Sequence, residues 1–164
     1  MKIASKVTKD MIEYYNSDVN RVNHALKVYG FAKCIGELED IKEQDTLELT
    51  AILHDIGIPD SERLYNSSAA KYQEMIGPKV AASILEKYNL PEKVLERIYY
   101  IIGNHHTYDK IDGIDFQILV EADFLVNIFE GNYERAKIEM VKEKFFKTKT
   151  GLDLVDSLYL DNVR

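Results

Sequence analysis

The sequence predicts an all-α protein with a single domain. Apolar residues recur at the three- and four-residue spacing of amphipathic helices, and no segment shows the alternation of a half-buried strand. The three prolines and eight glycines indicate short turns between helices. A chain of 164 residues can bury one sizeable core. We therefore expect one helical bundle over residues 1–164, with its core at about 18–130 and C-terminal helices at about 133–160.

The first half of the chain is predicted to contain three helices, at about residues 5–16, 18–38 and 43–56. The second can be capped by Ser17 or Asp18. The third is apolar on most sides, which predicts a central position. One apolar face of this helix is formed by Leu49, Ile52, Leu53 and Ile56. A second apolar face begins with Leu47 and Ala51.

Gly57 and Pro59 are predicted to end the third helix. Residues 57–76 then read as an irregular loop, which can form a lid over a site. Pro78 suits the first position of a fourth helix, at about 78–88. The remaining helices are expected at about 91–103, 116–129, 133–146 and 150–160, with a turn at 111–115.

The composition limits the classes of function. A formal net charge of −7 argues against binding a nucleic-acid polymer or an anionic membrane, although it leaves room for a small phosphorylated ligand. Cys34 is the only cysteine, so an internal disulfide is impossible. The N-terminal residues lack the apolar core of a signal peptide, and no apolar run approaches the length of a membrane span. We expect a cytoplasmic protein and predict no oligomeric state.

Two carboxylates stand inside apolar runs, where an unpaired charge is costly. Asp55 follows His54 at the end of the central helix, and Asp123 lies in the later apolar helix. Glu121 lies two residues before Asp123 and should face elsewhere. Together with His24, these histidines and aspartates are a plausible set of metal ligands. Taken one by one, each is also explained as a helix cap, a core residue or an ion-paired acid, and spacing alone leaves the two explanations balanced.

Three segments, NHALKVYGFA, LTAILHDIG and ILVEADFLVN, resemble in this order the H…HD…D signature of the HD-domain superfamily of metal-dependent phosphohydrolases. The resemblance spans about residues 18–130. It implies an all-α fold, in agreement with the helical periodicity. It also implies one bound divalent ion. Histidine and aspartate ligands can bind Mn, Fe, Co, Ni, Zn or Mg, so the identity of the ion stays open. The implied metal ligands are His24, His54, Asp55 and Asp123.

The sequence also departs from the pattern of many relatives. Those relatives carry two more histidines before the last aspartate and hold two metals. Here NHHTY supplies His105 or His106 as the second, but KYQEMIGPKVAA has no histidine where the first is expected. This absence favours one metal over two. Glu74 is either a substitute ligand or a solvated loop residue, and Ile58 stands where many relatives have a lysine after the HD glycine.

The resemblance implies hydrolysis of a small phosphorylated substrate, and we expect a nucleotide. Asp55 would be both a ligand and the proton acceptor for the attacking water, as is proposed for members of the family. His105 or His106 would hydrogen-bond the phosphate or protonate the leaving oxygen. Arg21 and Lys71 are candidates for binding the substrate, with a surface ion pair as the alternative for Arg21. The rival hypotheses are a diiron oxygenase of the HD type and a metal- or ligand-binding module without turnover.

Overall fold

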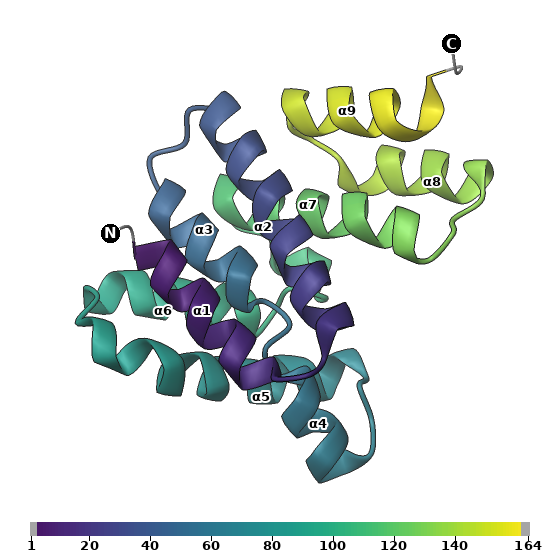
Figure 1. Ribbon diagram of the computed structural model, residues 1–164. Helices are drawn as coiled ribbons and strands as arrows, with labels where there is room; N and C mark the ends of the chain where they lie inside the picture. Colours follow the sequence, from purple (N-terminus) through teal and green to yellow (C-terminus); the bar gives the residue numbers. More distant parts are fainter. Residues whose placement is uncertain (1–2, 162–164) are drawn as a thin grey trace.

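The structure is a computed structural model that describes residues 3–161, and these residues form helices joined by short turns, with no strand among them (Figure 1). The predicted all-α class is therefore confirmed. The α-helices are α1 (Ile3–Tyr15), α2 (Val19–Leu38), α3 (Gln44–Leu53), α4 (Ile58–Tyr65), α5 (Ala70–Leu85), α6 (Glu92–Ile102), α7 (Ile114–Glu130), α8 (Arg135–Phe145) and α9 (Lys149–Val155). Single 3₁₀ turns follow α5 and precede α7, and a π-helical turn at Asp156–Leu160 follows α9.

Helix α3 lies at the centre, as its sequence predicts, because every residue from Thr46 to Leu53 is buried. Helices α1, α2, α6 and α7 pack around it. Its two apolar faces enter two different groups of core residues. Leu47 and Ala51 pack with α2, α7 and the C-terminal helices, whereas Leu49 and Ile52 pack with α1, α5 and α6. The central helix therefore joins the two halves of the core, and it ends where the candidate site begins.

The expected irregular loop at residues 57–76 is wrong, because most of that segment is helical. Helix α4 carries Pro59 in its first turn, where a proline needs no hydrogen-bonded N–H. Pro59 therefore lies at the start of α4, whereas the sequence predicted that it ends the preceding helix. Asn66 ends α4 in the left-handed conformation, with φ of 50°. The connection that remains before α5 is only residues 66–69.

The expected helix start at Pro78 is also wrong, because Pro78 lies inside α5, which begins at Ala70. A proline within a helix costs one backbone hydrogen bond. Burial of this part of α5 offsets that cost: Ile76, Val80 and Ala81 all lie in the core. Local sequence therefore marked a boundary at Pro78 that the tertiary packing overrides.

A close contact between two glycines brings α5 against the end of α3. A Cβ atom on Gly57 would lie 2.6 Å from the backbone nitrogen of Gly77, and one on Gly77 would lie 2.7 Å from the side chain of Ile102. Any larger residue at either position would push these backbones apart. The glycine after His54 and Asp55 thus allows α5 and α6 to approach that turn.

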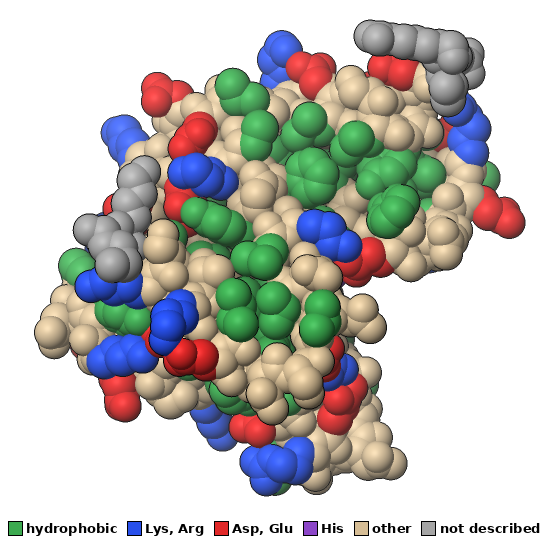
Figure 2. Space-filling view, viewed as in Figure 1, with side chains coloured by type: hydrophobic (Ala, Val, Ile, Leu, Met, Phe, Trp, Pro, Cys, Tyr) green, Lys and Arg blue, Asp and Glu red, His purple; other side chains and the backbone are tan. Residues whose placement is uncertain are grey.

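The surface in Figure 2 shows apolar side chains along α2 and toward α8 and α9, with charged side chains spread around them. Among the exposed apolar residues are Leu38 and Phe129, at 68% and 70% exposure. Single apolar residues at the surface are normal in a protein of this size. Within residues 3–161, no helix combines the length and apolar character needed to cross a membrane.

Candidate metal centre

The four predicted metal ligands come together although they lie far apart in the sequence. His24 comes from the second turn of α2, His54 and Asp55 from the turn after α3, and Asp123 from the middle of α7. His24 Nε2 lies 3.2 Å from Asp123 Oδ1 and 3.5 Å from Asp55 Oδ2. His54 Nε2 lies 3.4 Å from Asp55 Oδ2 and 3.6 Å from Asp123 Oδ1. Ligands bound tetrahedrally at about 2.1 Å are separated by about 3.4 Å, so this spacing fits one shared cation.

The orientation of His54 supplies the best evidence that these residues fit a metal ion. Its Nδ1 lies 2.8 Å from the carbonyl oxygen of Ala51, to which Nδ1–H donates. Its Nε2 is buried and has no hydrogen-bond partner among the described residues. A metal-binding imidazole is typically held in this way, with one nitrogen donating to a carbonyl and the other free for the ion. An unpartnered buried nitrogen aimed at two carboxylates matches a metal ligand better than a core histidine.

The electrostatics of the cluster also favour a cation. Burial by itself would raise the pKa of Asp55, but the charge of His54 and a hydrogen bond from His105 hold that pKa well below its usual range. Burial would likewise raise the pKa of Asp123, but a hydrogen bond from His24 and the nearby charge of His54 lower it. Burial likewise opposes the charge on His54, yet Asp55 and Asp123 raise its pKa well above the ordinary value. Both carboxylates are therefore ionised at neutral pH and attract either protons or a metal ion.

His24 has a partner that the sequence analysis missed. Its Nδ1 lies 2.8 Å from Oε2 of Glu130, and Glu130 also forms an ion pair with Lys27. Glu130 follows Asp123 by seven residues, so the two share one face of α7. This spacing was the signal in the sequence that could have identified Glu130.

His105 extends the cluster on the other side of Asp55. Its Nδ1 donates to the carbonyl oxygen of Ile102 at 2.8 Å, and its Nε2 lies 3.2 Å from Asp55 Oδ1. Asp55 therefore directs one oxygen toward His24 and His54 and the other toward His105. Asp55, His105 and His106 form a second group whose candidate ligand atoms lie within 4.8 Å of one another.

His106 differs from His24 and His54 in the direction of its pKa shift. Burial, together with the charge of His105, lowers the pKa of His106 to about 4. Its Nε2 lies 3.2 Å from Oε1 of Gln73, a residue that the sequence analysis did not assign to the site. A neutral imidazole at pH 7 can donate or accept a hydrogen bond, but it holds no extra proton to deliver.

Glu74 is not a solvated loop residue, and its carboxylate bonds to a neighbouring turn. It lies on α5 and is half-buried. Its carboxylate accepts hydrogen bonds from the backbone N–H of His106 at 3.0 Å and from the hydroxyl of Thr107 at 2.9 Å. Glu74 therefore holds the turn that carries His105 and His106.

The two candidate substrate-binding cations lie in different surroundings. The guanidinium of Arg21 pairs with Asp18 at 2.5 Å and with Glu62 at 2.7 Å, and so ties α2 to α4. Lys71 is exposed, and its Nζ lies over the ring of Tyr72. Tyr72 stacks on Tyr65, with ring centroids 4.4 Å apart. The structure therefore joins the ends of α4 and α5 through aromatic contacts and gives Arg21 two carboxylate partners.

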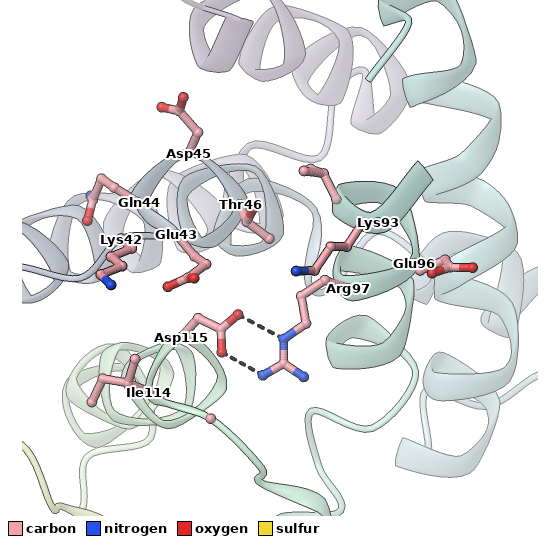
Figure 3. Close-up of a pocket in the computed structure, with 12 residues that line it drawn as sticks. Lys42, Glu43, Gln44, Asp45, Thr46, Lys93, Glu96, Arg97, Ile114 and Asp115 are labelled. Carbon is pink, nitrogen blue, oxygen red and sulfur yellow. Dashed lines mark hydrogen bonds and ion pairs between the residues drawn. The ribbon is translucent and has the colours of Figure 1, made fainter. Parts of the chain in front are cut away.

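A cavity of about 870 Å³ lies at the opposite ends of the same helices, where α3, α6 and α7 begin (Figure 3). Its wall includes the ion pair of Arg97 with Asp115, at 2.6 Å. Thr46 lines this cavity and lies eight residues before His54, which is about 12 Å of helix. The cavity is thus separate from the histidine and aspartate cluster.

Comparison with known proteins identifies the family. The HD domain family model matches residues 21–147, and the chain therefore belongs to the HD domain family. A crystal structure of a predicted HD superfamily hydrolase from an uncultured Thermotogales bacterium has a TM-score of 0.68 to this chain. The likeness covers 97% of this chain and 84% of that one at 19% identity, and it shows a shared fold. No curated protein matches the sequence.

Proposed function

We propose that the protein is a metal-dependent phosphohydrolase that acts on a small phosphorylated substrate, and specifically on a nucleotide. The observation that carries this proposal is the convergence of His24, His54, Asp55 and Asp123, with the unpartnered Nε2 of His54 between the two carboxylates. Membership of the HD domain family supports the same reaction class.

In this proposal, His24, His54, Asp55 and Asp123 hold one divalent ion. Such an ion supplies Lewis-acid chemistry, because it polarises a phosphoryl oxygen and makes water easier to ionise. The Asp55 carboxylate, which is ionised at neutral pH, accepts a proton from the attacking water. His105 holds Asp55 in place through its contact with Oδ1.

The remaining candidates act on the phosphate or its leaving group. A neutral His106 serves as a hydrogen-bonding partner of the substrate, in keeping with its lowered pKa. His105 is the better candidate for a proton donor, because its Nε2 faces Asp55. Arg21 can reach a phosphate only if the phosphate replaces Glu62 or Asp18 as its partner. Lys71 is exposed and needs no such exchange.

The number of metal ions is tested by elemental analysis of the purified protein. We propose one ion in the site of His24, His54, Asp55 and Asp123. The contact of the second Asp55 oxygen with His105 supports a weaker second site. One equivalent at low metal concentration and a second only at high concentration is the expected result.

Activity is tested by incubating the protein with a panel of phosphorylated metabolites and added Mn, Co, Ni or Mg. We expect release of inorganic phosphate that His54→Ala and Asp55→Ala abolish. Cys34→Ser, at an exposed position on α2, is the matched control and should keep the activity. Metal binding without turnover on the whole panel would favour a binding module. Two irons per chain with uptake of oxygen would favour an oxygenase.

A further inference from the structure

The three imidazoles beside Asp55 are oriented by two different kinds of acceptor. His54 and His105 each follow a helix end, and each donates Nδ1–H to the carbonyl of the residue three positions earlier. The last carbonyls of a helix have no partner within the helix, so they are free to accept such a bond. The backbone therefore supplies the acceptor behind each of these two imidazoles.

His24 cannot be oriented in that way. It is the sixth residue of α2, a helix of 20 residues, where carbonyl groups are already bonded within the helix. Its Nδ1 instead faces Oε2 of Glu130 at 2.8 Å, while Nε2 faces Asp123 and Asp55. A side chain from α7 thus replaces the backbone acceptor that this position lacks.

We propose that Glu130 is a positioning residue that fixes the ring of His24 with Nε2 directed at the metal site. This inference rests on the metal site of the proposed function and adds a residue that holds one of its ligands. A carboxylate behind a metal-binding imidazole selects the tautomer and makes the ligand nitrogen a better electron donor. Because Asp123 and Glu130 lie on one face of α7, this helix contributes one ligand and also orients another.

Lys27 provides the competing explanation. It lies three residues after His24 and pairs with the other oxygen of Glu130. In this explanation, Glu130 serves only as an ion-pair partner that ties α2 to α7. The two roles are separable, because replacing Lys27 removes the ion pair and leaves the contact between Glu130 and His24.

The test compares Glu130→Ala, Glu130→Gln and Lys27→Met in the full chain. Equilibrium dialysis measures the affinity of each for Mn²⁺ alone, and thermal unfolding without metal measures stability. We expect Glu130→Ala to weaken Mn²⁺ binding by about 10- to 100-fold. Glu130→Gln should recover most of that loss, because its amide oxygen still accepts from Nδ1–H. Lys27→Met should keep the affinity within about threefold, while its melting temperature falls as in Glu130→Ala.

A spectroscopic measurement checks the same role without metal. In long-range ¹H–¹⁵N spectra, the Nδ1 proton of His24 should be protected from exchange in the wild type and in Lys27→Met, and exposed in Glu130→Ala. Equal losses of affinity in Lys27→Met and Glu130→Ala would overturn the positioning role, as would unchanged Mn²⁺ binding in Glu130→Ala. A wild-type chain that does not bind Mn²⁺ would instead overturn the metal site, and this role with it. Absence of phosphate release affects neither measurement.

Discussion

Glu121 and Asp123 lie two residues apart on α7, yet their carboxylates serve different parts of the molecule. Glu121 is fully buried and accepts hydrogen bonds from the backbone N–H groups of Lys147 and Thr148, at 2.6 and 2.9 Å, where α9 begins. Asp123 Oδ1 lies 3.2 Å from His24 Nε2. One acid fastens the C-terminal helices to the core, and the other belongs to the candidate metal site.

Replacing Asp123 by Asn should therefore remove metal without unfolding the protein. The amide keeps nearly the same volume but loses the negative charge that the site offers to a cation. We expect at least a tenfold loss of metal affinity, measured by elemental analysis after dialysis against a fixed concentration of Mn²⁺. Unchanged metal content in Asp123→Asn would show that the ligand set is wrong.

Glu121→Gln is the matched control on the same helix. Both backbone N–H groups donate to Oε1, so the amide oxygen of the glutamine can keep these bonds, but its NH₂ would then face the hydroxyl of Thr148, which now donates to Oε2 in a buried site. We expect a decrease of about 2–3 kcal/mol in the free energy of unfolding, with metal affinity retained. Urea unfolding measures this change, and a loss of metal equal to that of Asp123→Asn would contradict the division of roles.

Gly57→Ala should disturb both stability and the metal site. The added Cβ would meet the backbone of Gly77 at 2.6 Å and the carbonyl of Gln73 at 2.8 Å, so α5 must move away. We expect a loss of about 1–3 kcal/mol of stability and weaker metal binding, because Gly57 lies two residues after Asp55. Gly30→Ala is the control. Gly30 is exposed on α2, and a Cβ atom added there would meet nothing within 4 Å. Gly30→Ala should therefore raise the free energy of unfolding by about 0.5–1 kcal/mol.

Metal binding should strengthen as the pH rises. Without metal, the pKa of His54 is well above its ordinary value of 6.5, because the nearby carboxylates outweigh burial. The proton on His54 therefore stabilises the metal-free fold fully below pH 6.5, and this contribution is lost as the pH rises through the raised pKa. A metal ion must displace that proton. The increase in melting temperature caused by Mn²⁺ should thus be larger at pH 8.5 than at pH 6.

Acid should destabilise the metal-free fold for the opposite reason. The pKa of Asp55 and that of Asp123 lie below the ordinary value of 3.8, since hydrogen bonds and charge from the histidines outweigh burial. Their stabilising contribution is present above pH 3.8 and is lost as the pH falls through the lowered values. Melting temperatures between pH 5 and pH 2 measure this loss. Asp123→Asn should show a shallower decrease than the wild type over that range.

The role of Arg21 can be tested against that of its partner. If Arg21 only ties α2 to α4, then Arg21→Met and Glu62→Gln remove the same ion pair and change the kinetics equally. If Arg21 binds the substrate phosphate, Arg21→Met raises KM, whereas Glu62→Gln frees the guanidinium and leaves KM unchanged or lower. We expect the second pattern, with metal content unaffected in both variants. Steady-state kinetics on the substrate found by screening provides the measurement.

The sequence by itself determined the helical class, the central position of α3 and its two apolar faces. These follow from the period of the apolar residues, which records burial directly. It also raised His24, His54, Asp55 and Asp123 as a candidate set, because buried charges in apolar runs need partners, and the resemblance to the HD-domain superfamily implied that they bind one metal ion. The prediction that Glu121 faces away from Asp123 came from the helical twist alone.

Only the tertiary structure decided what lies next to these residues. The helices at 58–65 and 70–85 stand where the sequence predicts a loop, and α5 approaches the turn after α3 at the contact of Gly57 with Gly77, which no local propensity encodes. The partnership of Glu130 with His24 spans 106 positions of sequence, and that of Glu74 with His106 joins α5 to a turn after α6. Local patterns state which side chains must be buried or paired. Which side chain pairs with which depends on the distances between helices, and the packing of the core sets those distances.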